Sequence, residues 1–111
     1  MSCIFCKILA GEIPCNKVYE NDDFLAFRDI NPQAPVHLLA IPKTHVKDFN
    51  DVTPEMMAAM TTFIQEVVEK EGLKEKGYRL VNNIGGNGGQ EVPHLHFHII
   101  GGARLRWGNF V

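Results

Sequence analysis

The segment His94-Leu95-His96-Phe97-His98-Ile99-Ile100 alternates imidazole and apolar side chains. Successive side chains of a β-strand point to opposite faces, so this alternation predicts a strand from Val92 to Ile100 with its three imidazoles on one face. Histidines that merely sit on a half-exposed strand are the alternative. The chain has 5 histidines, and the other two are His37 and His45. This concentration favours chemistry or metal binding.

The segments around this strand predict four more strands and two helices. A short helix from about Cys3 to Ala10 would be capped by Ser2 and would end at Gly11. A long helix would follow Thr53 as its N-cap, with Pro54 at the first helical position, and end before Gly72. The further strands are short apolar runs bounded by turn residues at positions 18–19, 24–27, 37–41 and 78–81.

The long helix carries apolar side chains at helical spacing, which favours core packing over a ligand groove. These side chains are Met56, Met60, Phe63, Ile64, Val67 and Val68. Together the elements predict one α+β domain over residues 1–111, an antiparallel sheet of about five strands with one long and one short helix.

Composition excludes several classes of protein. A formal net charge of -2 and scattered basic residues argue against a nucleic-acid partner. No apolar run is long enough for a membrane span, and Lys7 and Glu12 interrupt the N-terminal region too early for a signal peptide. Three cysteines are an odd count, and the Cys3-x-x-Cys6 spacing suits metal or redox chemistry rather than a disulfide framework. We therefore expect a cytoplasmic protein.

A glycine-rich loop, Gly85-Gly86-Asn87-Gly88-Gly89, precedes the histidine segment. Glycines let the backbone approach a ligand, and successive N–H groups in such a loop can form an anion-binding concavity. A plain flexible hairpin loop is the alternative. The GxxxxGK pattern of triphosphate loops is missing from the sequence. A metal site on the histidine strand would usually add a carboxylate. A phosphate beside the histidines instead suggests phosphoryl or nucleotidyl transfer through a covalent histidine intermediate.

The motif His94-x-His96-x-His98, preceded by Gly88-Gly89-Gln90, resembles the histidine triad (HIT) family and, within it, the Hint branch of histidine triad nucleotide-binding proteins. Further matching blocks are Phe5-Cys6-Lys7-Ile8, Glu12-Ile13-Pro14, residues 26–37, residues 41–45, and the stretch from Gly101-Gly102 to Trp107. The resemblance implies a HIT-like fold. It also implies hydrolysis of purine nucleoside phosphoramidates, with release of an adenosine or guanosine monophosphate and without a catalytic cofactor.

The resemblance also implies a role for each matching residue. His96 would attack the α-phosphorus and form a nucleotidyl-histidine that water hydrolyses, with His98 at the phosphate and His37 orienting and protonating the reacting groups. Asp29 would bind the ribose hydroxyls. The remaining nucleotide contacts would be Ile4, Phe5, Ile8, Phe27 and Ile30 around the purine, and Asn83, Gly89, Gln90 and Val92 around the phosphate or leaving group.

Glu91 occupies a position where animal members of the family that the chain resembles have a serine. A carboxylate there repels a phosphate but attracts an amine leaving group. Two alternatives stay open: a catalytically slow nucleotide-binding partner protein, and a metal-binding strand site unrelated to nucleotides.

The resemblance further implies a structural zinc ion held by Cys3, Cys6, His45 and His94, because family members with the same cysteine pair carry it. Four protein ligands leave no open position for water, as expected of a structural site. Cys15 would pack as a small apolar residue. A homodimer is also implied, with the tail from Arg104 to Trp107 reaching toward the partner's active site.

Overall fold

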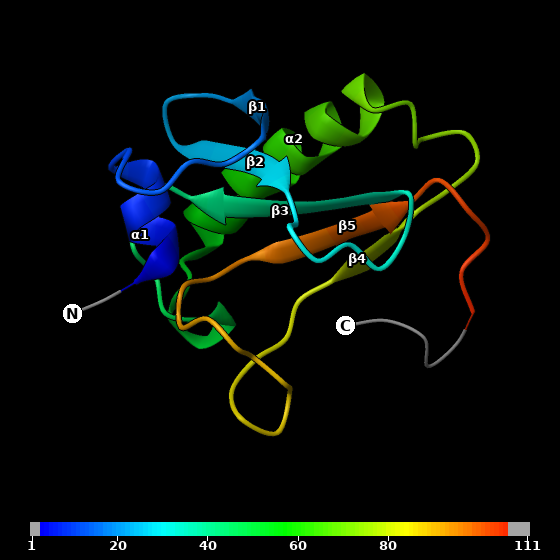
Figure 1. Cartoon of the computed structure of the whole chain (residues 1–111). Helices are drawn as coiled ribbons and strands as arrows, with labels where there is room; N and C mark the ends of the chain where they lie inside the picture. Colours follow the sequence, from blue (N-terminus) through cyan, green and yellow to red (C-terminus); the bar gives the residue numbers. More distant parts are fainter. Residues whose placement is uncertain (1–2, 107–111) are drawn as a thin grey trace.

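The computed structural model describes residues 3–106, which form one antiparallel sheet of five strands with a helix on each face (Figure 1). The elements in chain order are α1 (Ile4–Leu9), β1 (Lys17–Glu20), β2 (Phe24–Arg28), β3 (Val36–Pro42), a 3-10 turn (Phe49–Asp51), α2 (Pro54–Lys70), β4 (Arg79–Val81) and β5 (Phe97–Gly101). The strand order is β1-β2-β3-β5-β4, and every neighbouring pair is antiparallel. The predicted α+β class is confirmed.

Helix α2 begins and ends as the sequence predicts. The Thr53 side chain accepts a hydrogen bond from the Met56 backbone N–H over 3.1 Å, Pro54 occupies the first turn, and Gly72 follows the helix with a φ of +71°. Five side chains of the predicted stripe are buried and Met56 is partly buried. They pack on the sheet face formed by Phe24, Ala26, Leu38, Ala40, Leu95, Phe97 and Ile99.

The opposite face of the sheet packs against α1. Leu25, Phe27, Leu39 and Ile41 alternate along β2 and β3 with the residues that face α2, and they form a second cluster with Cys3 and Phe5. Both faces of the central strands are therefore buried. This second face, rather than the α2 face, carries the polar groups described below.

Helix α1 starts one residue later than expected. Cys3 is its N-cap, with extended backbone geometry and a sulfur that accepts a hydrogen bond from the Cys6 backbone N–H over 3.3 Å. The cap predicted for Ser2 lies outside the described residues. Gly11 follows the helix with a φ of +81°, so its predicted place at the helix end is confirmed.

The last strand is shorter than predicted. The sequence suggested Val92 to Ile100, but β5 covers Phe97–Gly101, and β4 likewise starts at Arg79 rather than Tyr78. Residues 92–96 turn instead of pairing, because Pro93 has no N–H and the N–H of His94 donates to the Val92 carbonyl over 2.8 Å. His94 and His96 consequently precede the strand, and only His98 lies on it.

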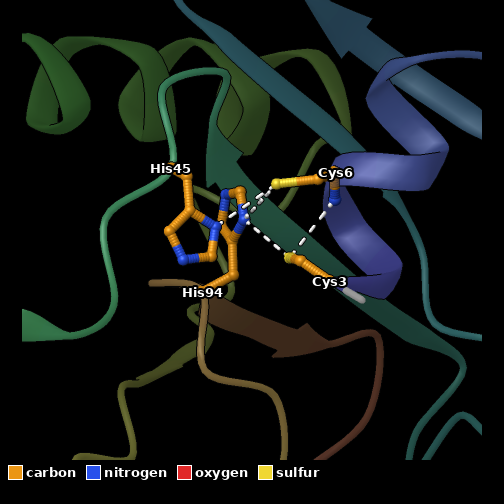
Figure 2. A group of neighbouring side chains, drawn as sticks. All are labelled: Cys3, Cys6, His45 and His94. Atoms are coloured by element: carbon orange, nitrogen blue, oxygen red, sulfur yellow. Dashed lines mark hydrogen bonds between the residues drawn. The ribbon is translucent and has the colours of Figure 1, made fainter. Parts of the chain in front are cut away.

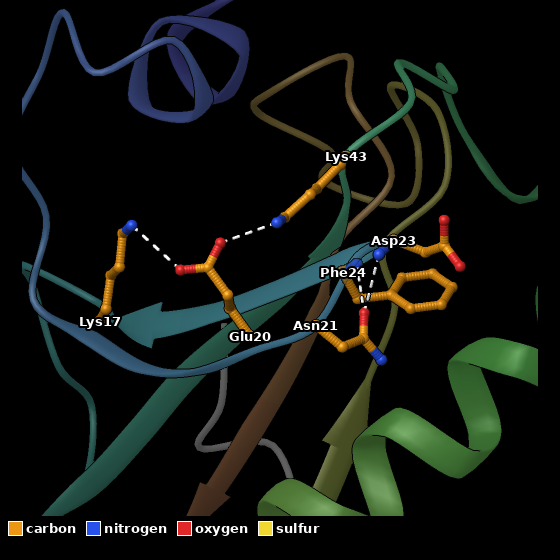
Figure 3. A network of polar contacts seen from close by, with 6 residues as sticks. All are labelled: Lys17, Glu20, Asn21, Asp23, Phe24 and Lys43. Carbon is orange, nitrogen blue, oxygen red and sulfur yellow. Dashed lines mark hydrogen bonds and ion pairs between the residues drawn. The ribbon is translucent and has the colours of Figure 1, made fainter.

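A side chain caps the turn between β1 and β2, and ion pairs join β1 to the end of β3 (Figure 3). The Asn21 side-chain oxygen accepts hydrogen bonds from the backbone N–H groups of Asp23 (2.9 Å) and Phe24 (2.8 Å), as expected of a turn residue. Glu20 pairs with Lys17 at 3.1 Å and with Lys43 at 2.7 Å. These hydrogen bonds, from Lys43 above all, hold the pKa of Glu20 below its usual value. The bridge ties the edge strand β1 to the end of β3.

None of the helices within residues 3–106 combines the length and apolar character needed to cross a bilayer. The tail residue Trp107, expected near a partner's active site, lies outside the described residues.

Candidate active site

A cavity of about 640 Å³ opens on the sheet face that carries α1. Its size lies within the range of small-molecule sites, which is about 300–1,000 Å³. Its lining includes residues of α1, of β2 and of the segment from Asn83 to His98. Of the residues that the sequence analysis assigned to a nucleotide, those lining the cavity are Ile4, Phe5, Ile8, Phe27, Asp29, Ile30, Asn83, Gly89, Val92, His96 and His98.

The lining of the cavity includes both apolar and polar side chains. Phe5 is buried, with its ring edge against Phe27 at a centroid distance of 5.7 Å and against His96 at 5.1 Å. Ile30 differs from the other apolar members, because its side chain is 98% exposed. It lines the cavity with its side chain open to solvent.

Gln90 does not line the cavity, in contrast to its expected phosphate contact. Its side-chain N–H groups donate to the backbone carbonyls of Lys47 (2.8 Å) and Val92 (3.0 Å), and its oxygen accepts from the Gly85 N–H (2.9 Å). The two N–H groups and the oxygen of this amide therefore bond to backbone groups of Lys47, Val92 and the glycine loop.

The glycine loop also differs from a simple anion cradle. The N–H of Gly89 donates to the Gly86 carbonyl over 3.1 Å, and the N–H of Gln90 donates to the Gly85 carbonyl over 3.0 Å. With the Gly85 N–H bound to Gln90, three amides of this segment are used internally. The tight fold needs glycine at position 88, where a Cβ would clash with the backbone of Ile84. These three amides are therefore already hydrogen-bonded within the segment.

His96 is oriented by the backbone just before it. Its Nδ1 lies 2.7 Å from the carbonyl oxygen of His94. A carbonyl can only accept, so Nδ1 of His96 carries the hydrogen and its Nε2 keeps a free lone pair. Burial lowers the pKa of His96 below its ordinary value, so the ring is neutral at physiological pH. This is the tautomer that a histidine nucleophile requires.

His37 and His98 form a second oriented pair across β3 and β5. The Gln33 backbone N–H donates to Nδ1 of His37 over 3.0 Å, so the hydrogen of His37 must sit on Nε2. That Nε2 lies 2.9 Å from Nδ1 of His98 and donates to it. The hydrogen of His98 is thereby placed on its own Nε2. Burial, with contributions from His96 and His37, lowers the pKa of His98 to about 4.

Asp29 completes this polar corner. One of its carboxylate oxygens accepts from the Asn31 backbone N–H over 2.8 Å, and the other lies 3.4 Å from Nε2 of His37. Asp29 partly opposes the burial that lowers the pKa of His37. Asp29 also lines the cavity. His37 does not line the cavity itself and reaches it through His98.

Several residues of this site could not be inferred from the sequence. Asn82 donates a side-chain hydrogen bond to the His96 carbonyl over 2.8 Å, while its own side-chain oxygen is buried and lacks a partner among the described residues. The neighbouring Asn83, which was assigned to phosphate, lines the cavity and donates to the Gly88 carbonyl over 2.7 Å. No signal in the sequence distinguishes the two asparagines. Further cavity residues that were not assigned to nucleotide binding are Ile13, Pro14, Cys15, Arg28, Asn31, Gln33 and Leu39.

A second cluster joins α1 to the segment before β5 (Figure 2). Cys3 and Cys6 of α1 meet His45, which follows β3, and His94, with all four ligand atoms within 4.8 Å of one another. Nδ1 of His94 lies 3.2 Å from the Cys3 sulfur and 3.6 Å from the Cys6 sulfur, and Nδ1 of His45 lies 3.3 Å from the Cys6 sulfur. Ligands of a tetrahedral zinc ion are about 3.3–3.8 Å apart. The three separations of 3.2, 3.3 and 3.6 Å are close to this range, so the four residues could hold a metal ion.

His94 is also in the correct tautomer for a metal ligand. Its Nε2 lies 2.9 Å from the Pro42 carbonyl oxygen and must donate to it, which leaves the Nδ1 lone pair facing the two sulfurs. Burial lowers the pKa of this ring and keeps it neutral. Asp29, His37 and His98 also converge, but there the ring nitrogens already bond to each other. The cysteine-containing cluster is the better metal site.

Comparison with known proteins agrees with this geometry. The model of the HIT domain family matches residues 10–105. A Helicobacter pylori protein named as an uncharacterized HIT-like protein is 64% identical over 101 residues, covering 91% of this chain and 97% of its own. The Escherichia coli protein named purine nucleoside phosphoramidase is 47% identical over 105 residues, covering 92% and 88%. The crystal structure of a HIT family hydrolase from Legionella pneumophila has a TM-score of 0.92 at 48% identity, covering 98% of this chain and all of its own.

Proposed function

The chain belongs to the HIT domain family, and on this premise we propose that it hydrolyses purine nucleoside phosphoramidates. The observation that carries the proposal is the bond from Nδ1 of His96 to the His94 carbonyl, which leaves Nε2 of a neutral, cavity-lining imidazole free to attack. The 47% identical Escherichia coli relative named purine nucleoside phosphoramidase supports the substrate class.

In the proposed reaction, Nε2 of His96 attacks the α-phosphorus, and the bond from phosphorus to the amine nitrogen breaks. The nitrogen takes up a proton and leaves as an amine, and the nucleotidyl group stays on His96. Water then attacks the same phosphorus, which restores the imidazole and releases the nucleoside monophosphate. Overall, one water supplies a hydroxyl to phosphorus and a hydrogen to nitrogen. His98, whose Nε2 carries hydrogen, is suited to donate to a phosphoryl oxygen as charge develops.

The lining of the cavity supports one assignment of the two ends of the substrate. The apolar wall with Phe5 and Phe27 suits the flat purine, and Asp29 suits the ribose. Glu91 lines the same cavity, and its charge acts on His96. A carboxylate in this place favours a cationic amine, such as a lysine side chain, as the leaving group over an anionic one.

The test is a single-turnover experiment with adenosine phosphoramidates of several amines. Wild-type protein should gain the mass of one adenylyl group, and the adduct should disappear in His96→Ala together with turnover. Binding of adenosine monophosphate should persist in His96→Ala, because the base and ribose contacts are elsewhere. A nucleotide that binds without forming an adduct would instead favour the slow nucleotide-binding partner. Failure to bind a purine nucleotide would contradict both.

Two further properties belong to this proposal. We propose that Cys3, Cys6, His45 and His94 hold a structural zinc ion, supported by the fit of their separations to tetrahedral coordination. We also propose a homodimer. Strand β4 is an edge of the sheet, and Tyr78, Leu80 and Ile84 on or beside it are exposed apolar residues that a second copy could cover.

A further inference from the structure

His94 connects the cluster of Cys3, Cys6, His45 and His94 to His96 in the cavity. Its ring nitrogen Nδ1 faces the sulfurs of Cys3 and Cys6, while its backbone carbonyl accepts the hydrogen bond that orients His96. The ring is fully buried and fixed at its other end by the Pro42 carbonyl. A group that holds the His94 ring therefore also holds the atom that selects the tautomer of His96.

Helix α1 makes the same connection through a second route. Cys3 and Cys6 enclose Ile4 and Phe5 in the sequence, and Ile4, Phe5 and Ile8 line the cavity. The Phe5 ring touches both His94 and His96 by its edge, at centroid distances of 5.7 Å and 5.1 Å. A helix of 6 residues is too short to be stable by itself and depends on what anchors it. Its anchors include the Phe5 contacts and the two thiols, beside the packing of Ile8 and Leu9 on the sheet.

From these two connections we infer that metal binding at Cys3, Cys6, His45 and His94 is thermodynamically coupled to nucleotide binding in the cavity. A metal that joins α1 to His94 orders the apolar wall and the His94 carbonyl in advance. Nucleotide binding then loses less conformational entropy, because these groups are already ordered. The coupling must be reciprocal, so the nucleotide also raises the affinity for the metal by the same factor. The inference rests on the proposed function only in that the cavity binds a purine nucleotide.

The experiment measures both halves of this cycle on the full chain, under reducing conditions and at constant pH. The zinc dissociation constant is obtained by competition with a chelator, with and without saturating adenosine monophosphate. The dissociation constant of adenosine monophosphate is obtained by calorimetry, with and without zinc. We expect each ligand to tighten the other by one common factor, which for such couplings is roughly 5- to 150-fold. An adenosine monophosphate affinity unchanged by zinc would overturn the inference.

A matched pair of variants separates the metal from its neighbours. His45 is exposed, contributes a ligand atom and does not line the cavity. His45→Ala should weaken zinc binding. Its affinity for adenosine monophosphate should equal that of the metal-free wild type and should not change when zinc is added. Thr44→Ala changes the exposed residue next to it in the same loop and should retain both wild-type affinities and their coupling. Equal nucleotide binding by zinc-loaded wild type and His45→Ala would contradict the inference.

Amide hydrogen exchange shows whether the coupling is local. Removing zinc should speed exchange in α1 and around residues 94–96 and leave α2 and the central strands protected, and adenosine monophosphate should partly reverse the change. Loss of protection throughout α2 would mean that the metal holds the whole fold, which overturns a specific link to the cavity. If adenosine monophosphate binds neither form, the proposed function fails. If it binds both equally, only the present inference fails.

Discussion

Nε2 of His37 lies 2.9 Å from Nδ1 of His98, and this contact decides where the hydrogen of His98 sits. Since Nδ1 of His37 is occupied by the Gln33 N–H, the hydrogen of His37 must point to His98. The donor that His98 offers to the cavity is therefore set by a residue that does not line the cavity itself. His37 is in this sense a positioning residue.

Replacing His37 by alanine should lower kcat about a hundredfold, in the range of a lost acid–base contribution, and change the binding of adenosine monophosphate much less. His37→Gln should recover part of the loss, because its amide N–H can donate toward Nδ1 of His98. The measurement is steady-state kinetics with nitrogen-15 NMR of the imidazoles. The NMR signal of His98 should indicate hydrogen on Nε2 in the wild type and a mixture of tautomers in His37→Ala. An unmixed His98 signal in that variant would contradict the positioning role.

Acid should destabilise the protein partly through His98. Its pKa is lowered from 6.5 to about 4 in the folded chain, mainly by burial. Between these values the unfolded chain binds a proton that the folded chain rejects, so the free energy of unfolding falls as pH falls, by about 3 kcal/mol over the whole interval. Above 6.5 the contribution is constant. His37, His94 and His96 have pKa values lowered in the same direction.

Urea unfolding across this pH interval measures the effect. The variant His98→Asn keeps the metal ligands and the other histidines, so its free energy of unfolding should fall less steeply with acid than that of the wild type. Parallel curves for the two proteins would show that His98 does not have a depressed pKa.

Zinc should stabilise the chain through the cluster of Cys3, Cys6, His45 and His94. Protein purified without chelator should contain about one zinc ion per chain, given four ligands per ion. Cys6→Ser should reduce both the zinc content and the melting temperature. If free zinc exceeds its dissociation constant a thousandfold, the loss amounts to about 4 kcal/mol. Cys15→Ser provides the control for zinc content, because Cys15 lies outside the cluster. Equal zinc in the wild type and Cys6→Ser would reject this assignment.

The edge strand β4 should mediate self-association. Leu80 is 46% exposed on this strand, and an aspartate there would place a charge in any apolar contact between two copies. Light scattering should give a dimer mass for the wild type and a monomer mass for Leu80→Asp. Phe49→Ser removes an exposed apolar residue of the 3-10 turn instead and should leave the mass unchanged. A wild-type monomer at micromolar concentration would contradict the proposal.

Patterns with a local physical cause could be predicted from the sequence. Helix α2 could be predicted from Thr53, Pro54 and the apolar spacing, because helix caps and periodicity depend on residues that are close in the sequence. The length of β5 did not follow, because alternation alone cannot reveal that Leu95 donates its N–H to Val46 in a distant loop. Periodicity put Leu95 on the core face correctly, but it could not show where pairing with β3 begins.

Some residues of the candidate site could likewise be predicted from the sequence, and others could not. Residue types with distinctive chemistry, such as His96 and Asp29, lie on or at the cavity where the sequence suggested. The amides were harder to predict, since Gln90 and Asn82 satisfy backbone groups whose positions depend on the folded loop. An amide can serve a ligand or a carbonyl equally well, and only the three-dimensional structure distinguishes the two.

The contacts that fix the imidazole tautomers have a consequence for how this fold can evolve. His37, His94 and His96 are each fixed by a main-chain atom, namely the Gln33 amide and the carbonyls of Pro42 and His94. A carbonyl is supplied by every residue type, and an amide by every type except proline. Substitutions elsewhere on the cavity wall can therefore change its shape while the tautomers of these three rings stay the same. Proteins that share this backbone can therefore differ in the lining of the cavity and still hold these imidazoles in the same hydrogen-bonded states.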